Sequence, residues 1–325
     1  MQYRKMGRTG LKVSAICLGT MTYGNQVGET DAIGIINHAF ASGINFLDTA
    51  DSYAERRSEE IVGKAIRDKR QQVILATKVA SKVGSGPNDA GLSRKHIMQG
   101  VEESLRRLQT DYIDLYYAHV PDYDTPIEES LRAFHDLISQ GKVRYIACSN
   151  FYAWQLCKAL WVSDRNHLSR FECIQSPYNL ITRDIEYELL PLCASEGVGV
   201  TVYNPLAAGL LTGKHDPTKP PAPGTRFTME RMGPIYYERY WSAPNFEAVA
   251  KFKQISERNG RSLTHFSLAW ILSNPTITSV IMGASSVRQL EENLGALDVK
   301  LTPEELSACD EVWRELRPLR FFYGR

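Results

Sequence analysis

The sequence predicts an α/β fold, a (β/α)8 TIM barrel, and two observations support this prediction. Short apolar runs alternate with longer amphipathic segments along the 325 residues, as expected for repeated βα units. Eight of these runs are rich in Val, Ile, Leu and Tyr, and eight strands with helical crossovers are typical of a closed barrel rather than an open sheet. No internal repeat or linker is evident, so we expect one domain over residues 1–325.

The expected elements follow one another in a regular order. The strands are predicted over residues 15–20, 44–48, 73–79, 112–119, 143–150, 171–176, 198–204 and 278–283. Helical patterns cover residues 30–43, 58–69, 93–109, 125–142, 183–197 and the segment after Ser286. Ser93 stands at an expected N-cap, Pro126 in a first turn, and Gly141 and Gly197 at left-handed helix ends.

Two segments fall outside this alternation. Residues 3–14 predict a short hairpin, with Gly10 at its turn, that caps the bottom of the barrel. Residues 214–245, the long loop after the seventh strand, are too rich in proline for a regular element and longer than ordinary connections. Such loops are functional lids or disordered segments, and the aromatic content of this one favours a lid.

Composition and charge exclude several classes of function. Lys and Arg number 38 against 37 Asp and Glu, so neither nucleic acid nor a membrane surface is an expected partner. Neither a secretion signal nor a membrane-spanning stretch is evident, and we expect a cytoplasmic protein. The six cysteines form no CxxC pair, which favours reduced, buried thiols over the alternative of a disulfide framework. The seven histidines lack zinc-binding spacing, and we expect no metal.

Polar side chains follow three consecutive predicted strands, where the active sites of such barrels lie. Asp48 ends the second strand and Tyr53 lies in the loop after it, while Lys78 and His119 end the third and fourth. Each alone has a structural explanation, as a turn cap, barrel packing, a solvent-reaching lysine or a core histidine. Their placement together predicts a shared chemical site.

These four residues predict a proton-donating device. An ammonium such as that of Lys78 stabilises the phenolate of a nearby tyrosine and so lowers its pKa from about 10. We expect Asp48 to hold Lys78, Tyr53 to protonate a carbonyl oxygen, and His119 to orient that oxygen. The set lacks a reductant, so a cofactor is required.

The later strands predict a surface for that cofactor. Ser149, Asn150 and Gln175 suit a carboxamide, and Tyr203 suits stacking on a flat ring, as nicotinamide requires; the alternative is that they only satisfy backbone groups at the rim. Glycines near residue 209 suit a pyrophosphate, and the helix start at Ser285 and Ser286 suits a second phosphate. The full set of expected cofactor contacts is Gly19, Thr20, Asp48, Ser149, Asn150, Gln175, Tyr203, Asn204, Leu206, Ala208, Gly209, Lys214, Gly283, Ser285, Gln289, Glu292 and Asn293.

Motifs spread over nearly the whole chain resemble the aldo-keto reductase family. They include GRTGLKVSAICLGTMTYG, GINFLDTADSY, SEEIVGKAI, SLRRLQTDYIDLYYAHVPD, GKVRYIACSNF, QSPYNL, YNPLAAGLLTGK and ASSVRQLEEN. The resemblance implies a catalytic tetrad at Asp48, Tyr53, Lys78 and His119, nicotinamide contacts on the later strands, and NADP(H) as cofactor. The chain is most similar to the bacterial, fungal and plant branches and to the β-subunits of voltage-gated potassium channels.

Two departures from that branch bear on the cofactor. Tyr203 and Asn204 stand where many relatives carry Trp and Ser, and Ser285 stands where many have an arginine that binds the 2′-phosphate. A serine hydrogen-bonds phosphate without supplying charge. Lys214, Arg288 or the helix N-terminus is expected to compensate, so we still expect NADP(H) to be preferred over NAD(H).

The expected function is reduction of aldehydes and ketones to alcohols, with a small-molecule carbonyl as partner. The substrate pocket is expected to include Tyr23, Tyr53, His119 and Trp241, with further aromatic residues of the lid, which suits aromatic or medium-chain carbonyls. One alternative is a cofactor-binding regulatory subunit similar to the channel β-subunits. Another is isomerase or aldolase chemistry on sugar phosphates. The sequence predicts no oligomeric state.

Overall fold

The structure is a computed structural model that describes residues 1–317, and this part of the chain divides into two compact units. The first comprises residues 1–176, 185–203 and 276–291. The second comprises residues 177–184, 204–275 and, of the described chain, 292–317. The expectation of one domain over residues 1–325 stays a prediction, and residues 318–325 lie outside the described residues.

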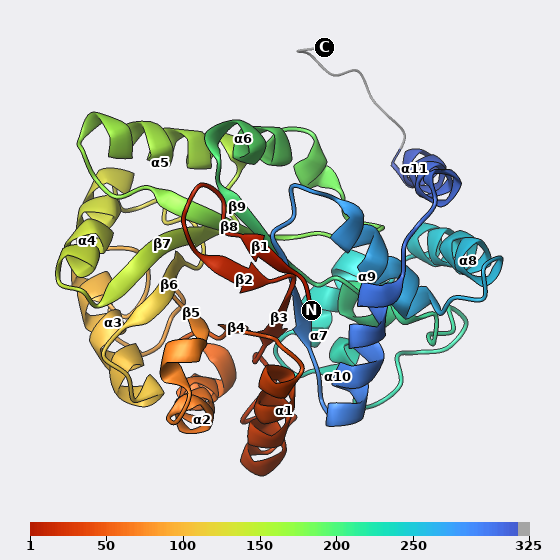
Figure 1. Cartoon of the computed structure of the whole chain (residues 1–325), viewed down its shortest axis with the longest axis horizontal. Coiled ribbons are helices and arrows are strands. Elements are labelled where there is room, and N and C mark those ends of the chain that lie inside the picture. The colour runs from red at the N-terminus through yellow and green to blue at the C-terminus, as the bar shows by residue number, and fades with distance from the viewer. Residues whose placement is uncertain (318–325) are drawn as a thin grey trace. The chain divides into compact units, whose positions relative to one another are not determined.

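The first unit contains a closed barrel of eight parallel strands, which confirms the predicted fold class (Figure 1). Around the barrel the strands follow the order β10, β3, β4, β5, β6, β7, β8 and β9. Their bounds are β3 (Ile16–Gly19), β4 (Phe46–Asp48), β5 (Ile74–Val79), β6 (Ile113–Ala118), β7 (Val143–Ser149), β8 (Phe171–Pro177), β9 (Gly199–Tyr203) and β10 (Ser279–Gly283). Every predicted run therefore forms a strand, because strands buried on both faces are almost continuously apolar.

Helices surround the barrel on its outside (Figure 1). They are α1 (Glu29–Ala41), α2 (Arg57–Ile66), α3 (Arg94–Leu108), α4 (Ile127–Ser139), α5 (Ala153–Arg165) and α6 (Leu189–Glu196), each packed against the next, and α10 (Val287–Leu294) follows β10. Ser93 caps α3 by accepting a hydrogen bond from the His96 amide. Gly141 and Gly197 adopt positive φ after α4 and α6, as predicted.

A two-stranded hairpin closes the bottom of the barrel, as predicted. Strands β1 (Tyr3–Lys5) and β2 (Lys12–Ser14) pair antiparallel, and Met6, directly after β1, and Val13 of β2 belong to the buried barrel core. The tight turn depends on Gly7, which has a φ of +53° and lies so close to Gly197 and Gly199 that a Cβ would clash with their backbone. The glycine that this turn requires is therefore Gly7 rather than Gly10.

The second unit is helical. It contains α7 (Gly233–Tyr240), α8 (Ala243–Glu257), α9 (Leu263–Ser273) and α11 (Pro303–Leu316), with short 3₁₀ turns η4 (Ala207–Thr212), η5 (Arg226–Thr228) and η6 (Gly295–Asp298). The expectation that residues 214–245 hold no regular element was wrong, because η5 and α7 lie within them. Pro234 sits in the first turn of α7, where a missing N–H costs nothing. None of the helices within residues 1–317 combines the length and apolar character needed to cross a membrane.

Candidate active site

Lys78 is the buried centre of the predicted catalytic group. Its side chain is fully buried at the end of β5. The ammonium donates three hydrogen bonds, to Asp48 Oδ1 at 2.6 Å, to the Thr49 carbonyl at 2.7 Å and to Tyr53 Oη at 3.1 Å. Burial alone would lower the pKa of Lys78, but the Asp48 carboxylate and then Tyr53 outweigh it and hold this pKa above its usual value. The raised pKa favours the protonated form of Lys78 at neutral pH.

Asp48 ends β4 and uses both carboxylate oxygens. Oδ1 accepts from Lys78, and Oδ2 accepts from the Gln175 side-chain amide on β8 at 2.9 Å. Only 2% of Asp48 is exposed, so a carboxylate without these partners would be costly there. The aspartate thus fixes the position of the lysine and ties it to a residue predicted to bind the cofactor.

Tyr53 begins the 3₁₀ turn η1 (Tyr53–Arg56) directly after β4. Its ring lies under the ammonium, with 4.7 Å from Lys78 Nζ to the ring centre. The three residues that follow, Ala54, Glu55 and Arg56, all have positive φ between 46° and 76°. Non-glycine residues rarely adopt this conformation, so the backbone next to Tyr53 is held under strain by the surrounding contacts.

His119 follows β6 and contacts Tyr53 edge to face, with 5.9 Å between ring centres. Its Nδ1 lies 3.3 Å from the hydroxyl oxygen of Ser81. Burial, assisted by the nearby Lys78 charge, lowers the pKa of His119 to about 3. A pKa this low favours the neutral imidazole at physiological pH, and the neutral ring can donate or accept a hydrogen bond.

The predicted nicotinamide contacts on β7, β8 and β9 form one hydrogen-bonded group. Ser149 Oγ donates to the Gln175 carbonyl at 3.0 Å, and Asn150 Nδ2 donates to Ser149 Oγ at 3.0 Å and to the His119 carbonyl at 2.9 Å. Tyr203 donates from its hydroxyl to Asn150 Oδ1 at 2.8 Å, and its ring is partly exposed at the end of β9. The structure therefore brings these four residues to the same end of the barrel as the predicted catalytic group.

Gly19 and Thr20 lie where β3 ends beside Asp48. A Cβ at Gly19 would come within 2.8 Å of the Ile281 side chain, so glycine is required there by packing. Thr20 is fully buried, and its hydroxyl bonds to the Asp48 carbonyl at 3.0 Å and to Ser58 Oγ at 2.8 Å. In this structure both residues support the strand that carries Asp48, and direct contact with a cofactor stays a prediction.

The start of α10 is already capped by side chains. The amide and hydroxyl of Ser285 both donate to Gln289 Oε1, at 2.7 and 2.9 Å, and Ser286 Oγ accepts from the Gln289 amide. Gly283, which ends β10, pairs with Gly19. A 2′-phosphate bound at the predicted site would therefore have to displace the Gln289 side chain from Ser285.

The remaining predicted residues have distinct local settings. Tyr23, expected in the substrate pocket, is fully buried, and its hydroxyl has no hydrogen-bond partner in the described residues. The others belong to the second unit, where Trp241 packs in an aromatic cluster with His215, Phe227, Tyr237 and Phe246. The second-unit set is Asn204, Leu206, Ala208, Gly209, Lys214, Trp241, Glu292 and Asn293. Their role toward the barrel residues stays a prediction.

The glycine-rich stretch expected to approach a pyrophosphate adopts unusual backbone. Asn204, Ala207, Ala208 and Gly209 all have positive φ, so the left-handed conformation extends well beyond the glycine. The Gly209 amide donates to the Leu206 carbonyl at 2.8 Å and is thus used inside the turn. The sequence singled out Gly209 for its freedom, but three neighbours adopt the same rare conformation without being glycine.

Several residues of the site were missed by the sequence analysis. Ser58 on α2 is buried and joins Thr20 to Thr49, whose carbonyl accepts from Lys78. Ser81 contacts His119, and Asp51 lies buried in the turn between Asp48 and Tyr53. The only available signal was their closeness in sequence to the tetrad, since single polar residues in loops are common.

Asp51 lines a cavity of about 140 Å³ behind the Tyr53 turn, with His96 and Arg56 among its other walls. One carboxylate oxygen of Asp51 and Nε2 of His96 are buried there without a protein partner in the described residues. Burial, with the nearby Glu59 carboxylate adding to it, raises the pKa of Asp51 to about 8. This raised pKa favours the protonated form of the Asp51 carboxyl group at neutral pH.

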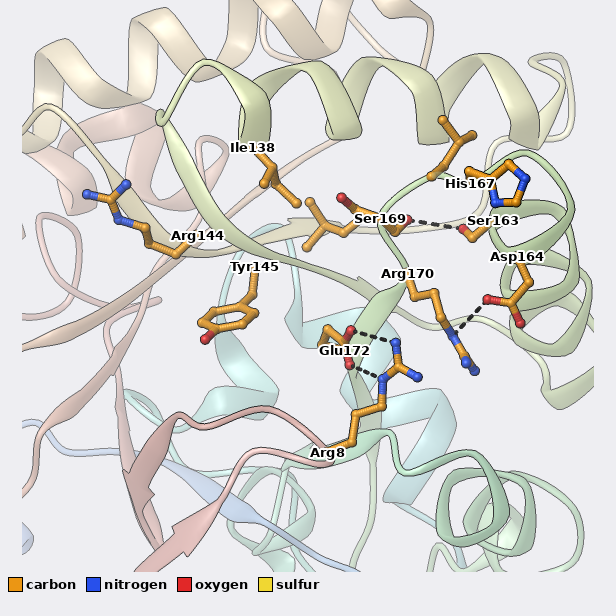
Figure 2. A pocket seen from close by; sticks show the side chains of 12 residues that line it. Arg8, Ile138, Arg144, Tyr145, Ser163, Asp164, His167, Ser169, Arg170 and Glu172 are labelled. Carbon is orange, nitrogen blue, oxygen red and sulfur yellow. Dashed lines mark hydrogen bonds and ion pairs between the residues drawn. The ribbon is translucent and has the colours of Figure 1, made fainter.

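A larger cavity of about 350 Å³ lies at the opposite end of the barrel (Figure 2). Arg8 of the hairpin turn pairs there with Glu172 at the start of β8, and Arg170 pairs with Asp164. None of the residues predicted for catalysis lines this cavity. No three or more His, Cys, Asp or Glu side chains within residues 1–317 are grouped to hold a metal ion.

Comparison with known proteins agrees with this geometry. The profile of the Aldo/keto reductase family matches residues 15–314. The chain belongs to the aldo/keto reductase family. This aldo/keto reductase is similar to a protein named probable voltage-gated potassium channel subunit beta from Arabidopsis thaliana, with 40% identity over 96% of each chain. It is also similar to the uncharacterized oxidoreductase YrpG of Bacillus subtilis, with 38% identity over 96% of each chain.

A third relative is the putative voltage-gated potassium channel subunit beta of Schizosaccharomyces pombe, 37% identical over 99% of this chain and 96% of that one. The resemblance to the branch that includes channel β-subunits is thereby confirmed. The family and the oxidoreductase relative together support an oxidoreductase.

Proposed function

We propose that this aldo/keto reductase reduces aldehydes and ketones to alcohols with NADPH, using Tyr53 as the general acid. The observation that carries the proposal is the ammonium of Lys78, placed between Asp48 Oδ1 at 2.6 Å and Tyr53 Oη at 3.1 Å with its side chain fully buried. A buried cation at hydrogen-bond distance favours the phenolate, and so makes the phenol a stronger acid.

The residues at the later strand ends fit a nicotinamide ring. A carboxamide needs both donors and acceptors, and Ser149, Asn150 and Gln175 offer both within one group of hydrogen bonds. The partly exposed ring of Tyr203 offers a flat surface beside them. When bound, the cofactor supplies a hydride to the carbonyl carbon of the substrate.

The side chains of the protein supply the proton and stabilise the charges that form. Tyr53 donates its hydroxyl proton to the carbonyl oxygen as negative charge develops there, and the Lys78 ammonium stabilises the phenolate that remains. The neutral His119 donates a hydrogen bond that orients the same oxygen. Asp48 keeps the ammonium in place throughout, and a proton from water restores the phenol after the alcohol leaves.

NADP(H) over NAD(H) is part of the proposal, and it is supported by the family and by the helix start of α10. The substrate is proposed to be an aromatic or medium-chain carbonyl. Dissociation constants for NADPH and NADH, measured by quenching of tryptophan fluorescence, test the cofactor. Equal affinity for the two would exclude a preference.

The activity is tested by following NADPH absorbance with a panel of aldehydes and ketones. Tyr53→Phe is expected to abolish turnover while NADPH still binds. Tyr145→Phe is a matched control, since it removes a tyrosine hydroxyl at the other end of the barrel, beside the cavity in Figure 2. Turnover that survives in Tyr53→Phe would refute Tyr53 as the acid.

A second candidate is a cofactor-binding regulatory subunit, which is favoured by the names of two of the relatives. It predicts tight NADPH binding without turnover of any carbonyl, and stable co-purification with a membrane protein. Turnover that depends on Tyr53 favours the reductase over this alternative.

A further inference from the structure

The turn η1, which begins with Tyr53, has a backbone conformation that its residue types do not favour. Ala54 and Glu55 lie in the left-handed region, with φ and ψ of 46° and 44° and of 53° and 45°, and Arg56 has a φ of 76°. None of these three residues is a glycine, and no residue of η1 is buried. Such a backbone persists only when its surroundings hold it, and burial of the turn does not supply that hold. Polar contacts from the turn are therefore needed.

The guanidinium of Arg56 makes such contacts. Its Nη1 donates to Glu103 Oε2 on α3 at 3.1 Å, and its Nη2 donates to the Val83 carbonyl, in the loop between β5 and α3, at 2.6 Å. All three residues line the cavity of about 140 Å³ behind the turn, so packed side chains do not fill this space. Arg56 therefore joins η1 to two neighbouring elements beside an open cavity.

The carboxylate that accepts from Arg56 is itself held in place. Glu103 Oε1 accepts a hydrogen bond from Gln99 Nε2 at 3.0 Å, one turn earlier on α3. Glu103 Oε2 also lies 3.6 Å from Nη1 of Arg107, one turn later on the same helix. A fixed acceptor makes the ion pair with Arg56 more restrictive than a pair between two mobile side chains.

The same group of ion pairs reaches the strand that carries Lys78. Arg107 Nε donates to Glu59 Oε2 on α2 at 2.7 Å, and Oε1 of this fully buried glutamate accepts from the Thr77 hydroxyl at 2.6 Å. Thr77 directly precedes Lys78 on β5. Ion pairs and hydrogen bonds thus connect the turn that begins with Tyr53 to the strand that carries its cationic partner.

We propose that Arg56 is a positioning residue, whose guanidinium holds η1 in its strained conformation and so keeps Tyr53 Oη 3.1 Å from Lys78 Nζ. The inference rests on the proposed function, in which Tyr53 is the acid. Without the guanidinium, the turn relaxes toward negative φ and carries the phenol away from the ammonium. A misplacement of about 1 Å in a catalytic group costs about 10²-fold in rate.

Steady-state kinetics of the full-length protein test the positioning, with NADPH and a carbonyl that the wild type reduces. Arg56→Gln should lower kcat about 10- to 100-fold and leave KM for NADPH within about twofold of wild type. The alkaline limb of its pH profile should move to higher pH, because a phenol farther from an ammonium releases its proton less readily. Arg56→Lys keeps a charge beside Glu103 and should recover part of the lost kcat.

Arg132→Gln is the matched control for these measurements. It removes an arginine that pairs with Glu128 at 2.7 Å on the outer helix α4, and it should leave kcat, KM and the pH profile unchanged. A kcat for Arg56→Gln within about twofold of wild type would overturn the proposal. A lower kcat with an unmoved alkaline limb would indicate loss of folded enzyme rather than loss of position, and would overturn it as well.

A double-mutant cycle with Ala54 tests the hold on the turn without any turnover. In the wild type, Ala54→Gly should raise the urea midpoint by about 0.3 M, because glycine accepts positive φ without strain. In the Arg56→Gln background the turn is already relaxed, so the same substitution should no longer raise the midpoint. An equal rise in both backgrounds would show that Arg56 does not hold the strain. A wild type that reduces no carbonyl would refute the proposed function instead, and the cycle would still decide the role of Arg56.

Discussion

Replacing Lys78 by methionine separates the structural role of its charge from the chemical one. Methionine keeps much of the side-chain length but removes the ammonium. The Asp48 carboxylate, which is 2% exposed, is then left with Gln175 as its one side-chain partner among the described residues. Breaking a buried ion pair in this way costs about 3–5 kcal/mol of stability. We therefore expect the free energy of unfolding, measured by urea denaturation, to fall by about that much.

Adding Asp48→Asn to this variant should restore part of the stability. The neutral amide removes the unpaired charge and can still bond to Gln175, so we expect a recovery of about 2 kcal/mol or more. Turnover should stay about 10²- to 10⁴-fold below wild type in both variants, because neither has a cation beside Tyr53. The double variant would thus be stable but inactive.

The same substitution at an exposed lysine is the control. Lys64 pairs with Glu29 at 2.7 Å, with both side chains more than 40% exposed, so Lys64→Met should cost at most about 1 kcal/mol. A Lys78→Met protein as stable as wild type would refute the buried pair as described. A double variant no more stable than Lys78→Met would show that the loss comes from packing and not from charge.

Three further predictions follow from the geometry. The pKa of Asp51 is about 8 in the folded protein and near 4 in the unfolded chain. The contribution of Asp51 to the free energy of unfolding of the wild type therefore falls as the pH rises from 4 to 8. The free energy of unfolding of Asp51→Asn, measured by urea titration, should therefore rise relative to that of the wild type by roughly 2–5 kcal/mol between pH 4 and pH 8. A difference between the two proteins that does not change with pH would contradict the raised pKa. Ser285→Arg should raise the affinity for NADPH about 10- to 100-fold and leave the affinity for NADH unchanged, as measured by fluorescence titration. An equal rise in affinity for both cofactors would show that the 2′-phosphate does not bind at Ser285. Gly63→Ala should destabilise the first unit by about 1–3 kcal/mol, because the added Cβ would lie 2.6 Å from the Leu108 carbonyl. Gly34→Ala on α1 is the control. Since the space around Gly34 is open, this substitution should be neutral or slightly stabilising in the same urea denaturation assay.

The strands were predictable because each has a local signal, and so was the placement of the candidate catalytic residues at the strand ends. A parallel strand is an apolar run, and a polar residue such as Lys78 or His119 at its end interrupts that run visibly. The helices were harder to predict from the sequence. The helical patterns named from the sequence did not include α5, α8, α9 or α11. Helix α9 is apolar nearly all round, and α5 carries tryptophans on its exposed face, so neither shows the contrast between faces on which the prediction depends.

The contacts that join the site were not predictable from local signals. The bond between Gln175 and Asp48 links residues 127 positions apart, and Ser58 and Ser81 become partners of the site only through the closure of the barrel. The exposure of Cys157 likewise differs from the expectation of buried thiols. Cys157 is exposed because its position in the helical repeat places it on the same side of α5 as the exposed tryptophans Trp154 and Trp161.

The hydrogen bond between Asp48 and Gln175 has a consequence for how variants of this protein are interpreted. In the strand order of the barrel, β4 and β8 are four places apart among eight, so they stand diametrically opposite, and this one bond spans the mouth from wall to wall. The bond thereby connects the aspartate that binds Lys78 to a residue of the proposed nicotinamide surface. A substitution at Gln175 that is intended to weaken cofactor binding also removes a hydrogen-bond partner from Asp48, so a loss of activity in such a variant is not by itself evidence of weaker cofactor binding.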